Sequence, residues 1–111
     1  MPSDKHQNTL DLLRREFVVK LVERLGVIEA AMTVLKDATD DTPRRAALKE
    51  IQSTAHLLSG SSALFGYPEV GETAQDLELA CQDALDVPTQ QAAVDQIWAK
   101  LKAAAGGKLD N

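Results

Sequence analysis

Residues 53–66, which read STAHLLSGSSALFG, decide the fold of this chain. In and just before this stretch, apolar or small side chains recur every three or four residues, the spacing of one face of an α-helix. They are Leu48, Ile51, Ala55, Leu58, Ser62 and Phe65, with Leu57 and Leu64 widening the apolar face on one side. At about 100° per residue, His56 falls opposite this face. We therefore predict a helix that buries one side and exposes a histidine on the other.

The surface around this histidine is made of small or polar side chains. Its neighbours at helical spacing are Gln52, Ser53, Ser59, Gly60 and Ala63. Glycine inside a helix costs about 1 kcal/mol relative to alanine, so Gly60 indicates that another molecule approaches closely, one turn after His56. We interpret this close approach as the function of the stretch.

The composition predicts a single all-α domain. The chain has 111 residues, of which 44% are hydrophobic, with only four prolines and six glycines. This length can bury a core without disulfides or metal, and the hydrophobic share excludes a mainly disordered chain. The net charge is −5 and the cations are scattered, which disfavours nucleic-acid and polybasic membrane binding.

The single cysteine and the lack of targeting signals indicate the cytoplasm as the compartment. No N-terminal run has the layout of a signal peptide, and no apolar run is long enough to cross a membrane. We therefore expect a cytoplasmic protein. Cys81 cannot form an internal disulfide and is expected to be a small buried side chain.

Four helices are expected from the hydrophobic periodicity. They span residues 8 or 9 to about 36, 43 to about 65, 68 to about 85, and about 90 to 105. The first should bury Leu10, Leu13, Phe17, Leu21, Leu25, Ile28, Met32 and Leu35. The third should bury Val70, Ala74, Leu77, Cys81 and Leu85, and the fourth Ala93, Ile97, Leu101 and Ala104, with Trp98 beside them. Leu12 and Val19 lie off the first stripe, as isolated exposed side chains or as part of a partner surface.

Short connectors between these helices favour an antiparallel up-down four-helix bundle over residues 8–105. Thr42 before Pro43 and Thr89 after Pro88 are expected to cap helices. Residues 1–7 and 106–111 are expected to be flexible ends, with the two glycines at 106 and 107 ending the last helix near a natural terminus.

The residue types exclude several chemistries. The chain has two histidines and no Glu-x-x-His pair, so a di-iron site is excluded and a zinc site lacks ligands. Ser53 and Ser59 lie within a turn of His56, but no oxyanion hole is evident, which disfavours a hydrolase. No glycine-rich phosphate loop is present. His56 is then either an idle surface histidine or a nucleophile that accepts a phosphoryl group on an unprotonated ring nitrogen.

The segment from His56 to Ala63, the Phe65-Gly66 pair and the segment from Ala74 to Glu78 resemble the histidine-containing phosphotransfer (HPt) domain family. The resemblance covers about residues 45–85. It implies that His56 is the phosphoryl acceptor and donor, and that Gly60 lets a response-regulator receiver domain dock flat against the helix. It also implies that Glu78 orients the imidazole through the nearer ring nitrogen. An exposed carboxylate without this role is the alternative for Glu78.

Ser59 departs from the family pattern, because most members have lysine at this position. A lysine would supply positive charge near the phosphoryl oxygens, whereas serine offers only a neutral donor. The departure bears on the lifetime of the phosphohistidine and on the efficiency of transfer, not on the identity of the acceptor.

The resemblance implies a phosphocarrier rather than an enzyme. Such a carrier relays a phosphoryl group between a sensor (hybrid) histidine kinase and response-regulator receiver domains. It is expected to be a monomer that binds no cofactor, with Mg²⁺ in the partner receiver domain. The expected docking face comprises Gln52, Ser53, Leu57, Ser59, Gly60, Ala63, Leu64 and Tyr67. Ordinary core positions are the alternative for the two leucines.

Two other functions stay open. A degenerate HPt-like module could dock on a receiver or kinase and inhibit it without carrying phosphate, as the serine at position 59 suggests. The chain could also be the phosphorylatable input domain of a larger chemotaxis-type kinase.

Overall fold

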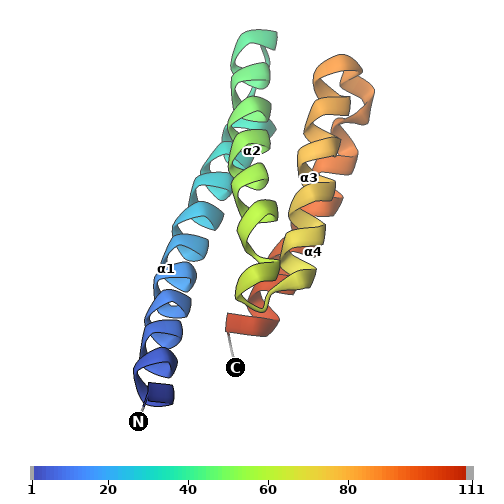
Figure 1. The fold of residues 1–111 in the computed structure, drawn as a ribbon. Helices are drawn as coiled ribbons and strands as arrows, with labels where there is room; N and C mark the ends of the chain where they lie inside the picture. The colour runs from blue at the N-terminus through green and yellow to red at the C-terminus, as the bar shows by residue number, and fades with distance from the viewer. Residues whose placement is uncertain (1, 110–111) are drawn as a thin grey trace.

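The structure consists of helices joined by short connectors (Figure 1). It is a computed structural model that describes the backbone of residues 2–109 and the side chains of residues 8–106. The four α-helices are α1 (Pro2–Asp37), α2 (Asp41–Ser61), α3 (Pro68–Asp86) and α4 (Gln91–Leu109). Two 3₁₀ turns separate the later helices, η1 (Ala63–Phe65) and η2 (Pro88–Gln90). Within residues 2–109 there is no strand, so the predicted all-α four-helix bundle is confirmed.

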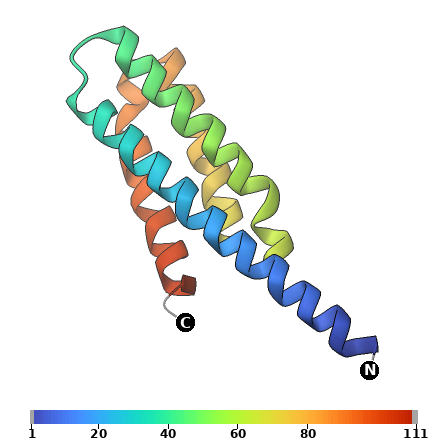
Figure 2. The same ribbon diagram turned by 90° about the vertical axis from the view of Figure 1, so that its left-hand side faces the viewer.

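Helix α2 lies between α1 and α3, and α3 in turn packs against α4. The contact between α2 and α3 is the most extensive, whereas α1 barely meets α4. With 36 residues α1 is much longer than the 21 residues of α2, and its N-terminal end extends past the other helices (Figure 2). The longest dimension of the molecule, 59 Å, is close to the length expected of this one helix.

The buried stripes of α2 and α3 follow the predicted spacing. On α2, Leu48, Ile51, Ala55 and Leu58 are fully buried. All five residues predicted for α3 are also buried. Cys81 is among them and has no disulfide partner, so its expected position in the core is confirmed. Because both faces meet along one seam, these two helices hold each other in a fixed register.

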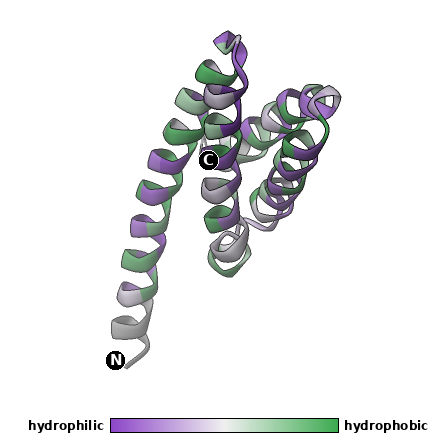
Figure 3. Cartoon of the chain, turned by 90° about the horizontal axis from the view of Figure 1, so that it is seen from above, coloured by the Kyte–Doolittle hydropathy of each residue, from purple (hydrophilic) through white to green (hydrophobic). Residues whose placement is uncertain are grey.

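Helix α1 differs from the prediction at its N-terminal end. It begins at Pro2 rather than at residue 8 or 9. Its predicted stripe is buried or partly buried from Phe17 to Leu35, but Leu10 and Leu13 are exposed. The reason is that this part of α1 has no neighbouring helix (Figure 2). Figure 3 shows hydrophobic and hydrophilic segments alternating along the coloured part of α1. Leu12 and Val19 are also exposed.

Neither predicted threonine cap is present. The residue before α2 is Asp40, which makes no side-chain cap bond, and Thr42 lies inside the first turn. This turn is held by Arg44, whose guanidinium contacts Asp41 Oδ1 at 3.0 Å and also donates to the carbonyl of Ala84 on α3. Thr89 lies within η2 and caps nothing.

The register of α4 also differs from the prediction. The buried residues are Val94, Trp98, Leu101 and Ala105, whereas the predicted Ala93, Ile97 and Ala104 are only partly buried. The large indole of Trp98 is the reason, because it is buried and donates its Nε1–H to Glu29 Oε2 on α1 at 3.0 Å.

The chain ends depart from the expected boundaries as well. Helix α4 continues through the two glycines to Leu109, so these glycines do not end it. The expected flexibility of residues 1–7 and 106–111 stays a prediction, and residues 1, 110 and 111 lie outside the described part.

Candidate functional site

His56 stands on the open face of α2, opposite the core. Its side chain is 71% exposed, while its neighbour Ala55 is completely buried. This contrast follows from the helical period, because adjacent residues of a helix lie about 100° apart. The sequence prediction of an exposed histidine is confirmed.

Glu78 of α3 holds one nitrogen of the imidazole. Its Oε2 lies 2.7 Å from His56 Nδ1 and its Oε1 lies 3.2 Å away. The Glu78 side chain is only 22% exposed, so the packing of α2 on α3 restricts its position. A carboxylate can only accept, so Nδ1 must carry the hydrogen. In the neutral ring this leaves Nε2 as an unprotonated nitrogen that is free to act as a nucleophile.

A second polar bridge between the same helices lies one turn away. Gln52 Nε2 donates to Gln82 Oε1 at 2.8 Å, and these residues lie four positions from His56 and Glu78 respectively. The two hydrogen-bonded pairs therefore join α2 to α3 at successive helical turns. Gln82 was not predicted as a site residue, although its spacing of four from Glu78 was a usable signal.

An open hollow of about 410 Å³ lies beside the imidazole. It is lined by Lys49, Gln52, Ser53, His56, Leu57 and Glu78. Lys49 is its only cation, and the sequence prediction did not include this residue. The signal available was its position seven residues before the histidine, which is two helical turns along the same face.

The rest of the predicted docking face continues toward the end of α2. Gly60, Ala63 and Leu64 are exposed there. Leu64 is 80% exposed and Leu57 is 53% exposed, so the alternative that these two leucines belong to the core is wrong. A Cβ added at Gly60 would meet nothing within 4 Å. The fold itself therefore does not require glycine at this position.

Two predicted docking residues are partly withdrawn from solvent. Ser59 donates its hydroxyl to the carbonyl of His56 at 2.9 Å, one turn back on the same helix. Tyr67 is partly buried because its ring packs beside that of Phe17, with centroids 5.3 Å apart. Phe17 also stacks on Phe65 at 5.0 Å. These rings fix the turn after α2, where Gly66 takes the left-handed conformation with φ 90°.

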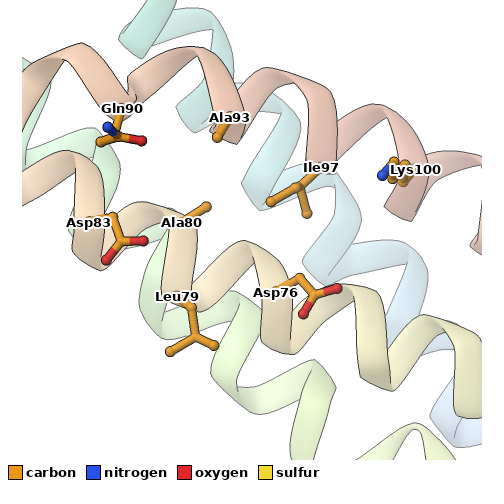
Figure 4. Close-up of a pocket in the computed structure, with 8 residues that line it drawn as sticks. All are labelled: Asp76, Leu79, Ala80, Asp83, Gln90, Ala93, Ile97 and Lys100. Atoms are coloured by element: carbon orange, nitrogen blue, oxygen red, sulfur yellow. The ribbon is translucent and has the colours of Figure 1, made fainter.

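A further hollow, of about 300 Å³, lies between α3 and α4 (Figure 4). Its charged residues are Asp76, Asp83 and Lys100, and it contains no histidine or cysteine. Asp76 and Asp83 lie on the side of α3 away from Glu78 at helical spacing. This hollow is therefore separate from the imidazole and offers no comparable nucleophile.

A metal cluster and a membrane span are both absent among the described residues. In this part of the chain there is no group of three or more His, Cys, Asp or Glu side chains placed to hold a metal ion. None of its helices is both long and apolar enough to span a membrane.

The family model of the Hpt domain matches residues 12–107. The chain belongs to the Hpt domain family. This match includes parts of all four helices of the bundle, well beyond the segment that carries the resemblance in the sequence. Hpt domains take part in histidine phosphotransfer in two-component signalling, where they interact with kinases and receiver domains. They act as phosphocarriers rather than as catalysts. No curated protein and no solved structure matches the chain.

Proposed function

We propose that this Hpt domain relays a phosphoryl group between a sensor (hybrid) histidine kinase and response-regulator receiver domains, and that His56 Nε2 carries it. The observation that supports this best is the pair of unequal ring nitrogens. Nδ1 is held by Glu78 at 2.7 Å, while the side chain as a whole is 71% exposed. A carrier needs this combination, because the ring must be fixed in one tautomer and still be reachable by a second protein.

The transfer step is an in-line displacement at phosphorus. The lone pair of Nε2 attacks the phosphorus of a receiver aspartyl phosphate. The new N–P bond forms as the P–O bond to the aspartate breaks, and the bonding pair leaves on the aspartate carboxylate. The hydrogen on Nδ1 stays in place, so the phosphorylated ring is cationic and Glu78 balances its charge. The reverse sequence unloads the domain onto the next receiver.

Positioning is what this chain contributes, because phosphoryl transfer depends mostly on alignment and on neutralisation of charge. We assign the Mg²⁺ of the reaction to the partner receiver domain and no cofactor to this chain. A monomer and a cytoplasmic location remain predictions.

The proposed docking face surrounds the imidazole. It consists of Gln52, Ser53, Leu57, Ser59, Gly60, Ala63, Leu64 and Tyr67. Exposed leucines on both sides of an exposed glycine support this assignment, since apolar side chains around a flat patch suit a protein partner. Tyr67 would contribute at the edge, through the aromatic contacts that fix the turn.

The test is transfer of radiolabel from a phosphorylated receiver domain. The wild-type chain should take up label that is acid-labile and base-stable, as a phosphohistidine is. His56→Gln should take up none, while its helical content and unfolding midpoint stay those of the wild type. Equal labelling of His56→Gln would show that another residue is the acceptor.

A second function is supported by the contact of Ser59. Its hydroxyl bonds to the carbonyl of His56, so it is turned toward the backbone and not toward a phosphoryl group. A domain that lacks the family lysine at position 59 could bind and inhibit its partner without carrying phosphate. In that case His56→Ala would retain both partner affinity and inhibition. Loss of signalling in this variant, with binding intact, would reject the inhibitory module.

A further inference from the structure

Lys49 and His56 lie on the same face of α2. Seven residues separate them, which places Lys49 two turns before the histidine, roughly 10 Å along the helix and about 20° around it. Both residues line the hollow of about 410 Å³, with Gln52 and Ser53 on the turn between them. The lysine is thus the cation of this hollow.

The tilt of side chains on an α-helix turns the imidazole of His56 toward Lys49 and away from Ser59. Side chains on an α-helix lean toward its N-terminus, so the imidazole of His56 leans over the turn of Gln52 and Ser53, toward Lys49. Ser59 and Gly60 lie on the opposite side, one turn C-terminal. Ser59 does not line the hollow, and its hydroxyl is already bonded to the carbonyl of His56.

Lys49 is also the one cation of α2 that is not engaged elsewhere. The other two are Arg44, which contacts Asp41 and the carbonyl of Ala84, and Arg45, which donates to the carbonyl of Leu85 at 2.9 Å. Within residues 8–106, the side chain of Lys49 makes no hydrogen bond or ion pair. Its flexible four-carbon stem leaves the ammonium free to move toward a new anion.

We propose that Lys49 contacts the phosphoryl oxygens on His56 and supplies, from two turns before the histidine, the positive charge that most family members have three residues after it. Gln52 and Ser53 would add neutral donors. Gln52 has a second amide hydrogen besides the one donated to Gln82, and the Ser53 hydroxyl can turn away from the carbonyl of Glu50. This inference rests on the proposed function of His56 as the phosphoryl carrier.

A charge-assisted contact at an exposed site changes an equilibrium or rate by a modest factor. We expect Lys49→Gln to be loaded about three- to tenfold more slowly, and to lose its phosphoryl group faster by a similar factor. The difference should shrink at high salt, because exposed charges are screened. Lys49→Arg keeps the charge and should restore wild-type behaviour to within about twofold.

The experiment uses radiolabelled phosphoramidate as a small donor, so that no protein has to dock. Loading rate and phosphohistidine half-life are measured at low and high salt for the wild type, Lys49→Gln and Lys49→Arg. Lys100→Gln is the matched control, because it removes the same charge from the hollow between α3 and α4. Circular dichroism checks that each variant is folded.

The outcomes distinguish a failure of the role proposed for Lys49 from a failure of the role proposed for His56. Slower loading or faster loss in Lys49→Gln alone, restored by arginine, supports the role of Lys49. If Lys49→Gln equals both the wild type and Lys100→Gln, the role of Lys49 is rejected while His56 remains the carrier. A wild-type chain that takes no label on His56, from phosphoramidate or from a phosphorylated receiver, would overturn the proposed function and this inference together.

Discussion

Two segments with the same kind of apolar periodicity have different environments in this protein. The central apolar stripe of α2 is completely buried at Leu48, Ile51, Ala55 and Leu58, because α1 and α3 cover it. Residues 8–16 of α1 contain two leucines at helical spacing, Leu10 and Leu13, yet none of the residues in this segment is buried. The difference lies in the neighbours, since this end of α1 extends past the rest of the bundle (Figure 2). Periodicity therefore predicts which residues share a face, but not whether another helix covers that face.

The largest expected effect concerns the covered side of α3. Burial raises the pKa of the Cys81 thiol from its ordinary value of 9.0 to about 12. At about pH 8 the native thiolate fraction should then be lower by roughly 1,000-fold, and alkylation correspondingly slow. Iodoacetamide labelling in buffer and in concentrated guanidinium chloride tests this. Equal labelling rates in the two would show that the α3 face is not covered.

The same shift has a consequence for stability at high pH. The folded thiol stays protonated up to about pH 12, while the unfolded thiol ionises above its value of 9.0. The unfolded state is therefore favoured increasingly as the pH rises from about 9 to about 12. Cys81→Ala should remove this part of the pH dependence.

The next effect is a truncation in the covered face of α2. Leu58→Ala should lower the free energy of unfolding by about 2–5 kcal/mol, because Leu58 is completely buried and alanine leaves a cavity. Chemical denaturation followed by circular dichroism measures this. A loss below about 1 kcal/mol would mean that the α2–α3 seam is packed less tightly than described.

A smaller effect is expected when the imidazole loses the carboxylate that holds it. Glu78→Gln can still accept or donate a hydrogen bond, so it no longer enforces one tautomer and no longer balances the phosphorylated ring. We expect a fall of about 10- to 100-fold in the rate of phosphoryl transfer, with little change in stability. Transfer kinetics from a phosphorylated receiver measure it, and an unchanged rate would reject the orienting role.

Two substitutions of Gly60 should have different effects, one on stability and one on receiver binding. Gly60→Ala should raise the free energy of unfolding by about 0.5–1 kcal/mol, because the added methyl group meets open space inside a helix. Gly60→Leu should weaken receiver binding because it obstructs the docking face. Calorimetry of receiver binding tests the second part, and affinity unchanged by leucine would mean that the partner docks elsewhere.

The smallest effect is expected on the uncovered part of α1. Leu12→Ala should change the free energy of unfolding by less than about 0.5 kcal/mol, since this side chain is exposed and lies where α1 has no neighbour. It is the matched counterpart of Leu58→Ala, with the same substitution in the same kind of helix. A loss comparable to that of Leu58→Ala would show that a second molecule covers this part of α1 in solution.

Much of the fold was predictable because helical spacing is explicit in the sequence. The stripes of α2 and α3, the position of Cys81 and the exposure of His56 all follow from it. The register of α4 was not, because Trp98 belongs to its buried stripe and bonds to Glu29 on α1, whereas the prediction placed Trp98 beside that stripe. The threonine caps were wrong because α2 begins at Asp41, before Thr42, and because Thr89 lies within a 3₁₀ turn.

The candidate site was predictable in its chemistry but only partly in its extent. His56 and Glu78 were paired through the resemblance to the family, and the structure brings them within hydrogen-bonding distance. Lys49 and Gln82 were missed because each lies one or two turns from those residues, where spacing alone does not distinguish a site residue from an ordinary polar surface. The covered seam between α2 and α3 is what brings all four residues to one face.

We propose that Glu78 holds Nδ1 of His56 so that Nε2 of the same ring receives the phosphoryl group. Nuclear magnetic resonance of the chain with ¹⁵N-labelled histidine tests it most directly, before and after loading from a phosphorylated receiver. We expect the free domain to carry its ring hydrogen on Nδ1 of His56, and the loaded domain to show phosphorus coupling to Nε2 of the same residue. Coupling to Nδ1, or phosphorylation of any other residue, would contradict the account.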